Sequence, residues 1–466
     1  MSTELTSKKL LMVAYFFPPV GGLAAAGSQR TLKFAKYLLR EGWDPVVLTV
    51  REDAYEDYLD LDSTLLDRVP PEVKVVRTSV IRWLTRLLEL KNRLGAKPGG
   101  GENSHSSASA SNHEGQTVDV KTKYQKIKDS ISDLFEIPDG EIGWLLPAVF
   151  AGLRAIHREG IGVIYSTGKP WTAHLVGLVL RKMTRRPLVT DFRDPWMTNP
   201  FREEGSALKN RLEAFLEKKV IEGSDVVITN TIALREEFIK RFPLQSPEKF
   251  VALLNGFDPD DFPIASVEGK SPADPFVLAH TGFLYGRRDP RNFLEALELF
   301  LKSARVDREK IRVVFVGSVE LPYDLSRYLN SCGLERVVTL VPHLPYQESL
   351  QYLIHASALL LLQPGTETQV PSKLFEYVAL GKPILAISPR QGATSTLVAE
   401  EGIGYPVDPD DIESIAAVLE RMYLDWERGP ETYSGNGHVR DKFNVKHTTA
   451  ILSRTLDRVI SAEARN

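Results

Sequence analysis

One carboxylate, Glu376, lies in the stretch VPSKLFEYVALGKPILA, where the apolar spacing predicts a helix over residues 373–380 and a buried strand after it. Ser372 is expected to cap the helix start and Gly381 to end it, which places Glu376 on the flank of Lys373, one turn back. A solvated Lys373/Glu376 pair would contribute only roughly 0.2–0.5 kcal/mol. Alternatively, the two carboxylate oxygens accept both protons of a vicinal diol such as ribose, while Lys373 and the first helix amides hold phosphate.

Two glycine turns follow predicted strands, and each precedes a predicted helix. In HTGFLYGRRDPRN, Gly282 ends a strand and Arg287 and Arg288 follow, so the two guanidinium groups can neutralise a diphosphate or simply lie solvated in a turn. In FFPPVGGLAAAGSQR, Gly21 and Gly22 let the backbone approach a ligand at a helix N-terminus, which attracts anions. This turn lacks the GxGxxG pattern, which counts against a dinucleotide cofactor.

Apolar runs of strand length alternate with amphipathic runs of helix length, which predicts parallel strands joined by crossover helices. We expect an α/β protein with two Rossmann-like, doubly wound parallel-sheet domains over residues 1–264 and 265–440. A C-terminal helix within 441–466 is expected to pack back across the domain boundary. Residues 96–116 are rich in Gly, Ser and Asn and predict a disordered insertion. Because such sheets bind ligands at the carboxyl ends of their strands, the two domains are expected to share a cleft.

The composition is that of an ordinary globular protein, with 466 residues of which 43% are hydrophobic and 26% charged. The 58 basic and 61 acidic side chains nearly cancel, which gives no indication of nucleic-acid binding. The single cysteine, Cys332, cannot form an intramolecular disulfide, the N-terminal residues do not resemble a signal peptide, and no stretch of about 18 apolar residues is free of charge. These features predict a cytoplasmic protein.

Residues 79–97 predict an amphipathic helix just before the insertion. Its apolar stripe and its basic residues are, respectively, Trp83, Leu87, Leu90 and Leu94, and Arg82, Arg86, Lys91 and Arg93. Such a helix can make a peripheral contact with the inner face of an anionic membrane, or it can pack on its own domain. We favour the second interpretation.

Four stretches together, VPSKLFEYVALGKPILA, HTGFLYGRRDP, FFPPVGG and NGFDPDDF, resemble the GT-B glycosyltransferases of family 4, which are retaining enzymes. The resemblance covers nearly the whole chain outside residues 96–116, and the helix motif is its most specific part. It implies that the second domain binds a nucleotide sugar, for which we expect UDP rather than GDP, and that no metal or other cofactor takes part.

The resemblance also implies roles for particular residues of the donor site. Glu376 takes the ribose, and the groups on the diphosphate are Lys373, Arg288, Gly22 and the amides near Ser372 and Leu374. The family places a second glutamate eight positions before the ribose-binding one, close to the donor sugar, and this position is Thr368 here. Either Glu367 swings in from the neighbouring position, or Thr368 contacts the sugar itself.

Polar side chains also follow two predicted strands of the first domain. His174, in YSTGKPWTAHLVG, resembles the family histidine that faces the donor sugar, although a histidine in an apolar helix can instead be structural. The stretch TDFRDPW carries Asp191, Arg193 and Asp194. A cation there would compete with Arg193, so we expect no metal. These groups are expected to orient the acceptor hydroxyl or to lock the loop through an Arg/Asp network.

We therefore expect a retaining, metal-independent hexosyltransferase that moves a sugar from a nucleotide diphosphate donor to a hydroxyl of a glycan or lipid-linked saccharide, in cell-surface polysaccharide or glycoconjugate synthesis. Arg288, Lys373 and a helix N-terminus would stabilise the departing diphosphate. No side chain is an evident nucleophile, which suits the front-face route proposed for this family. Two alternatives of the same fold are a nucleotide-sugar 2-epimerase and a catalytically silent partner subunit.

Overall fold

The structure is a computed structural model, and it describes residues 8–21, 25–56, 59–82, 137–202, 205–262, 275–429 and 437–463. The chain divides into two units, Met1–Val227 with Asp457–Asn466, and Ile228–Leu456. The predicted insertion at 96–116 and the predicted domain boundary after residue 264 lie outside the described residues. None of the described helices combines the length and the apolar composition that crossing a bilayer requires.

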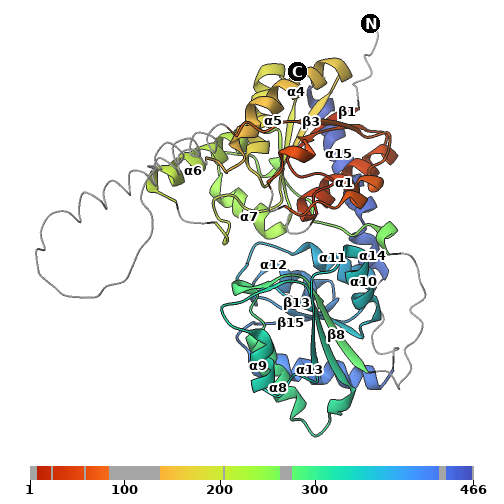
Figure 1. The fold of residues 1–466 in the computed structure, drawn as a ribbon. Coiled ribbons are helices and arrows are strands. Elements are labelled where there is room, and N and C mark those ends of the chain that lie inside the picture. Colours follow the sequence, from red (N-terminus) through yellow and green to blue (C-terminus); the bar gives the residue numbers. More distant parts are fainter. Residues whose placement is uncertain are drawn as a thin grey trace, which may run out of the picture. The chain divides into compact units, whose positions relative to one another are not determined.

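The first sheet has seven strands in the order β3-β2-β1-β4-β5-β6-β7 (Figure 1). Leu10 of β1 is aligned with Pro45 of β2 on one side and with Val163 of β4 on the other, both in parallel pairing. The strands are β1 Lys9–Ala14, β2 Asp44–Val50, β3 Lys74–Thr78, β4 Val163–Gly168, β5 Leu188–Phe192, β6 Val226–Thr229 and β7 Phe250–Ala252. The helices are α1 Ala25–Arg40, α4 Leu145–Glu159, α5 Thr172–Thr184, α6 Ala207–Gly223 and α7 Ile232–Arg241.

The second sheet has six strands in the order β12-β10-β8-β13-β14-β15. Its strands are β8 Phe276–Thr281, β10 Ile311–Val316, β12 Val338–Val341, β13 Ala358–Leu362, β14 Ile384–Ile387 and β15 Gly404–Val407, and β9 Leu284–Tyr285 pairs separately with β11 Val319–Glu320. The helices are α8 Arg291–Leu301, α9 Leu325–Ser331, α10 Tyr346–His355, α11 Ser372–Leu380, α12 Ala393–Glu400, α13 Ile412–Glu427, α14 Gly437–Lys442 and α15 Val445–Glu463. These two parallel sheets confirm the predicted fold class.

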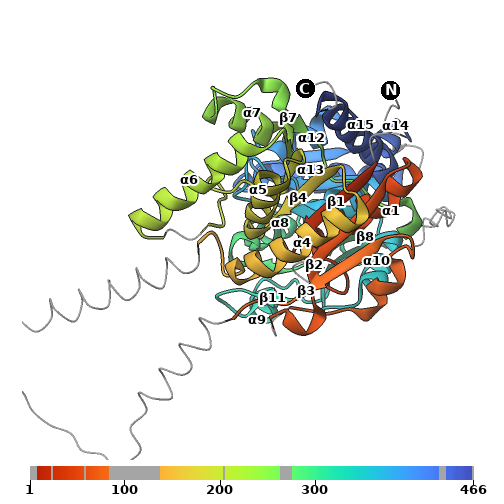
Figure 2. The ribbon, with the colours of Figure 1, turned by 90° about the horizontal axis from the view of Figure 1, so that it is seen from above.

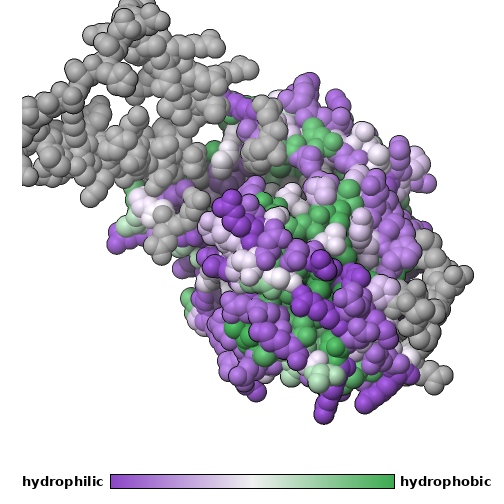
Figure 3. Space-filling view, turned by 60° about the horizontal axis from the view of Figure 1, so that its bottom comes forward, coloured by the Kyte–Doolittle hydropathy of each residue, from purple (hydrophilic) through white to green (hydrophobic). Residues whose placement is uncertain are grey.

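Helices cover both faces of the second sheet, so its strands are buried on both sides. In β13, Leu360 and Leu362 pack in the core under α8, α9 and α13, whereas Leu359 and Leu361 pack in the core under α10, α11 and α12. Alternate side chains of a strand point to opposite faces, which is why an uninterrupted apolar run is needed here. Figure 1 shows the two helix layers on either side of this sheet. On the one face that the space-filling view shows, hydrophilic side chains surround apolar patches (Figure 3).

One local prediction for α11 is wrong and another is confirmed. The N-cap position belongs to Pro371, no side chain caps the helix by a hydrogen bond, and Ser372 is the first helical residue. Proline suits this place because it restricts the backbone and offers no N–H that would need an acceptor. Gly381 ends the helix with φ 62°, as predicted.

Candidate functional site

The ends of β8 and β10 and the start of α11 meet at Gly282. Gly282 follows β8, donates its N–H to Val316 O at 2.7 Å and has φ +132°, a conformation that favours glycine. A Cβ at this position would lie 1.4 Å from Lys373 Nζ, so the ammonium group occupies the space that a side chain would need. Gly317 follows β10 with φ +142°, and a Cβ there would lie 2.3 Å from Gly282 O. Gly282 thus leaves the space that the Lys373 ammonium occupies, and Gly317 lets the end of β10 approach the backbone of Gly282 closely.

Neither cationic group of this region, Lys373 or Arg288, forms an ion pair with a carboxylate of the described residues. Lys373 makes no hydrogen bond or ion pair with any residue that the structure describes. Burial and then the charge of Arg288 lower the pKa of Lys373 to about 7, against the opposing effect of Glu376. Arg288 donates to Gln363 Oε1 at 3.1 Å, lies over the ring of Tyr285 at 5.5 Å, and makes no ion pair with a described carboxylate. Such a pair of cations at one sheet edge is suited to an anion.

Glu376 follows one turn after Lys373 on α11 and is half-buried. The Tyr346 hydroxyl of α10 donates to Glu376 Oε1 at 3.4 Å. Leu374 is fully buried, and its N–H already donates to Pro371 O at 3.0 Å. A phosphate that contacts this amide, as predicted, would have to share its proton with that carbonyl. Within the described residues the amides of Ser372 and Lys373 have no acceptor, and they are the first-turn donors best placed for a phosphate.

The candidates for the missing family glutamate lie in the loop before α11. Glu367 is exposed and Thr368 is half-buried. Their carbonyl oxygens accept from Ala393 N and Thr231 Oγ1, both at 2.6 Å, and these contacts hold the loop through its backbone. Neither side chain makes a hydrogen bond within the described part of the chain, so which of them contacts the donor sugar stays a prediction. Arg287, in the turn after β9, is exposed.

A buried polar network under Lys373 was not predicted. His280 Nδ1 lies 2.9 Å from Leu360 O, which can only accept, so Nδ1 carries the proton and Nε2 is left without a partner among the described residues. Burial and then the charge of Lys373 lower the pKa of His280 to about 3. The Tyr377 hydroxyl of α11 also donates to Leu360 O, at 3.2 Å, and accepts from Thr281 N at 3.5 Å. The network ties α11 to β8 and β13. The sequence feature that could have indicated this network is the histidine inside the apolar run FVLAHTG.

In the first unit, Asp191 on β5 is fully buried and its carboxylate is saturated. Arg30 of α1 donates to both oxygens, at 2.8 and 3.0 Å, and the hydroxyls of Tyr165 and Thr167 on β4 donate to Oδ2. Burial alone would raise the pKa of Asp191, but the Arg30 charge and these hydrogen bonds hold it below its usual range. The contacts favour a role in orienting the helix and loop, and contact with an acceptor stays a prediction. Sequence reasoning missed Arg30.

Arg193 lies against the first turn of α1. It donates to Lys169 O, and a Cβ on Gly27 would lie 2.4 Å from Arg193 Nη1. Asp194 is half-buried next to it. Gly22, in the glycine loop before α1, lies outside the described residues. No three His, Cys, Asp or Glu side chains in the described ranges gather in a way that could hold a metal ion.

His174, on α5, is fully buried. Its Nδ1 lies 2.9 Å from Ser166 Oγ, and a Cβ on Gly168 would lie 2.6 Å from its Nε2, which has no partner among the described residues. Burial lowers the pKa of His174 to about 3, so the ring is neutral. Its contact with the donor sugar stays a prediction.

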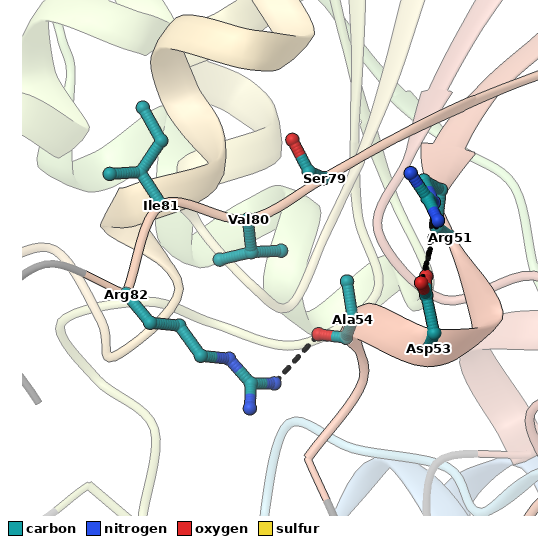
Figure 4. Close-up of a pocket in the computed structure, with 7 residues that line it drawn as sticks. All are labelled: Arg51, Asp53, Ala54, Ser79, Val80, Ile81 and Arg82. Carbon is teal, nitrogen blue, oxygen red and sulfur yellow. Dashed lines mark hydrogen bonds and ion pairs between the residues drawn. The ribbon is translucent and has the colours of Figure 1, made fainter. Parts of the chain in front are cut away.

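A second carboxylate of the first unit, Glu141, lies near the end of β1. It accepts from the Tyr15 hydroxyl, and burial raises its pKa to about 7, with Asp139 and Glu56 adding to the effect and Arg82 opposing it. A cavity of about 630 Å³ opens beside Arg82, beyond the ends of β2 and β3. Figure 4 shows its seven lining residues: Arg51, Asp53, Ala54, Ser79, Val80, Ile81 and Arg82. Both guanidinium groups that line the cavity already have hydrogen-bond partners. Arg51 donates to the Asp53 carboxylate, and Arg82 donates to Ala54 O at 2.7 Å.

Two family models match the chain. The one described as Glycosyl transferase 4-like domain matches residues 134–256, and the one described as Glycosyl transferases group 1 matches residues 261–435. A comparison with curated protein sequences finds no match.

Several solved structures share the fold. Anabaena Alr3699/HepE in complex with UDP aligns with a TM-score of 0.62 and 16% identity, over 97% of this chain and 100% of that one. Sucrose-phosphate synthase from Thermosynechococcus elongatus aligns with a TM-score of 0.61 and 16% identity, over 97% and 99%. The apo form of the lipopolysaccharide outer core galactosyltransferase WaaB aligns with a TM-score of 0.56 and 12% identity, over 98% and 99%. At these identities the likeness shows the fold alone.

The two Rossmann-like parallel sheets give this chain the GT-B fold of two-domain proteins. The two family models together cover more than half of the chain, and their descriptions name glycosyl transfer. The chain therefore belongs to the GT-B glycosyltransferases, as the resemblance of its motifs implied. The retaining mechanism and the assignment to family 4 stay predictions.

Gly282→Ala should raise the Kd for the nucleotide of the donor by about ten- to a hundredfold, because the new Cβ displaces Lys373 Nζ from the strand end and removes a charge-assisted contact of about 1.5–3 kcal/mol. The matched control is Gly286→Ala in the same turn, where a Cβ meets nothing within 4 Å. Isothermal titration calorimetry compares the variants. Equal affinities for that nucleotide would show that the position of Lys373 over Gly282 does not matter for binding.

Proposed function

We propose that the chain is a retaining, metal-independent glycosyltransferase that moves a sugar from a nucleotide diphosphate donor to a hydroxyl of a glycan or lipid-linked saccharide. The observation that carries the proposal is the pair Lys373 and Arg288, neither of which forms an ion pair with a described carboxylate. Lys373 Nζ lies against Gly282, and the charge of Arg288 acts on Lys373. Anabaena Alr3699/HepE, which has the same fold, was solved with UDP and with UDP-glucose, and this supports UDP over GDP. Hexosyl transfer in cell-surface polysaccharide or glycoconjugate synthesis is the role that we propose.

The proposed chemistry needs no nucleophile from the protein. The bond between the anomeric carbon and the diphosphate oxygen breaks, the acceptor oxygen bonds to the same face of that carbon, and the departing phosphate takes the acceptor proton. Negative charge grows on the diphosphate in the transition state. Lys373, Arg288 and the first amides of α11 are fixed donors that would stabilise this charge, and fixed donors cost little reorganisation during the reaction. Glu376 would orient the ribose.

The test is a panel of UDP-, GDP- and dTDP-sugars incubated with the full chain, in EDTA or in Mg²⁺, with nucleotide release and the anomeric configuration followed by NMR. We expect slow release of the nucleotide from one donor, with retention of the anomeric configuration of the sugar. EDTA should not change the rate of this release. Loss of activity in EDTA that Mg²⁺ or Mn²⁺ restores would overturn the metal-independent mechanism. Interconversion of the sugar without nucleotide release indicates the 2-epimerase, and nucleotide binding without turnover indicates the silent subunit.

Glu376→Ala should raise the Kd for UDP by about ten- to a hundredfold, because a charge-assisted hydrogen bond to ribose contributes about 1.5–3 kcal/mol. Glu298→Ala serves as the control, since Glu298 pairs with Lys302 on the exposed side of α8. Calorimetry with UDP measures both variants. If the Glu376 variant binds UDP as the wild type does, this carboxylate takes no part in nucleotide binding.

Donor affinity should fall as the pH rises through about 7, because burial and the charge of Arg288 lower the pKa of Lys373 to about 7. Below this pH the ammonium is charged and meets the diphosphate directly. Above it, binding must first take up a proton, so the Kd for UDP-glucose should rise by up to about tenfold per pH unit. UDP-glucose is the suitable probe because its diphosphate carries constant charge over this range. Titrations at pH 6, 7, 8 and 9 should lose this trend in Lys373→Met, and a flat wild-type profile would contradict the prediction.

The predicted membrane contact through residues 79–97 falls mostly outside the described residues, and the described Arg82 forms an ion pair with Glu56 at 3.2 Å. That contact, the identity of the acceptor and a cytoplasmic location stay predictions.

A further inference from the structure

Helices α4, α5 and α6 form one layer on the first sheet. The connections from β3 to β4, β4 to β5 and β5 to β6 step in one direction along the strand order, whereas the connection from β1 to β2 steps in the opposite direction. Crossovers between parallel strands are right-handed, so α4, α5 and α6 fall on one face of the sheet and α1 on the other. Figures 1 and 2 both show α4, α5 and α6 as neighbours.

This layer exposes large apolar side chains. The described residues include thirteen large apolar side chains that are exposed. Five of them belong to α4, α5 and α6: Leu146, Phe150, Met183, Leu208 and Phe215. Each has more than half of its surface accessible. Leu146 and Phe150 lie one turn apart on α4, and Leu208 and Phe215 lie two turns apart on α6, so each pair shares one face of its helix. Single exposed apolar side chains are common on protein surfaces, so it is their gathering on one helix layer that points to a contact surface.

The same layer is strongly basic. Its three helices, with Arg185 and Arg186 after α5, carry ten Lys or Arg and four Asp or Glu, although the whole chain has 58 basic and 61 acidic side chains. Eight of the basic residues are exposed: Arg154, Arg158, Lys182, Arg185, Arg186, Arg211, Lys218 and Lys219. Of the acidic residues, Glu213 and Glu217 are buried, Glu159 pairs with Lys74, and Glu222 pairs with Lys218 and Lys219. None of these four acidic residues is exposed, whereas eight of the ten basic residues are, so the charge excess of the layer faces outward.

We propose that the α4–α5–α6 layer is a surface that binds an anionic lipid bilayer. The apolar side chains would enter the headgroup region, and each nearby Lys or Arg contributes about fivefold to the partition coefficient. A second copy of the chain is a poor occupant, because symmetric pairing would place the basic residues opposite one another. Nucleic acid would meet the basic residues but leave the phenylalanines in water. The surface is distinct from residues 79–97 and does not depend on the acceptor.

The test is co-sedimentation of the full chain with vesicles of phosphatidylcholine, with or without phosphatidylglycerol, at low and physiological salt. Wild type should sediment with the anionic vesicles only, and less at higher salt. The variant Arg211→Glu, Lys218→Glu, Lys219→Glu should lose at least about a hundredfold in partition coefficient. Phe150→Ser with Phe215→Ser should weaken binding even at low salt. The matched control is Lys33→Glu, Lys36→Glu, Arg40→Glu on α1, which changes the same charge on the opposite face and should sediment like the wild type.

Circular dichroism and UDP affinity report whether each variant is folded. Wild type that stays in the supernatant with anionic vesicles at low salt overturns the proposal. So does equal loss in the α1 control, which would indicate attraction to net charge alone. If only Arg82→Glu, Arg86→Glu, Arg93→Glu abolishes sedimentation, the membrane contact lies in residues 79–97 instead. If the phenylalanine variant sediments unchanged while a DNA duplex competes with the vesicles, the surface binds polyanions.

Discussion

Replacing Lys373 by alanine is expected to lower kcat for sugar transfer by about 10²–10³. Negative charge grows on the diphosphate as its bond to the sugar breaks. Lys373 Nζ lies at the end of β8, in the space that the missing side chain of Gly282 leaves open. Because the ammonium makes no ion pair with a described carboxylate, its charge is not already neutralised. The substitution removes an interaction that is strongest in the transition state, so kcat should fall more than the affinity for the donor.

Steady-state kinetics with the donor found in the panel measures this effect. The control is Lys302→Ala, which removes an exposed lysine that pairs with Glu298 at 2.7 Å and should leave kcat within about twofold of wild type. Added guanidinium or methylammonium tests whether the lost charge can be restored from solution. A Lys373→Ala enzyme with wild-type kcat would remove Lys373 from the proposed mechanism and leave Arg288 as the only side-chain cation on the leaving group.

Asp191→Ala should lower the free energy of unfolding by about 3–5 kcal/mol, because it leaves the guanidinium of Arg30 buried without its counterion. Arg30 and Asp191 have exposed side-chain fractions of 4% and 0%, and their contact joins α1 to β5. Two hydroxyl donors, Tyr165 and Thr167, lose their acceptor in the same variant. Each donor left unpaired in the interior adds to the cost.

Urea unfolding followed by circular dichroism measures the loss. The matched control is Asp53→Ala, which breaks an ion pair with Arg51 of comparable geometry whose side chains are 66% and 56% exposed. That variant should change stability by less than about 1 kcal/mol, since water replaces the lost contact. If both variants shift the midpoint equally, burial of the Arg30 pair does not govern its contribution. Replacing Arg30 by Met together with Asp191 by Leu should recover much of the stability.

Most strands and helices of this protein can be predicted from short stretches of its sequence. Runs such as LLMVA and ALLLL are strand-length and uninterrupted because both faces of each sheet are covered, and the structure places them in β1 and β13. The spacing of α11 and the glycine at its end were equally local, as helical periodicity and left-handed backbone depend on neighbouring residues. β3 and β15 were not predicted, because their sequences, KVVRT and GYPV, are short and carry charge or proline.

Local sequence patterns were enough to predict two parallel-sheet domains and the candidates Lys373, Arg288 and Glu376. Which groups act together became visible only in the folded chain. Arg30 and Asp191 lie 161 positions apart, and their pairing depends on α1 and β5 meeting in the folded unit. The lowered pKa of Lys373 likewise follows from burial and from the charge of Arg288, neither of which is set by the neighbours of Lys373 in the chain. Burial and proximity between distant segments exist only once the chain has folded, and they determine the charge and partners of each site residue.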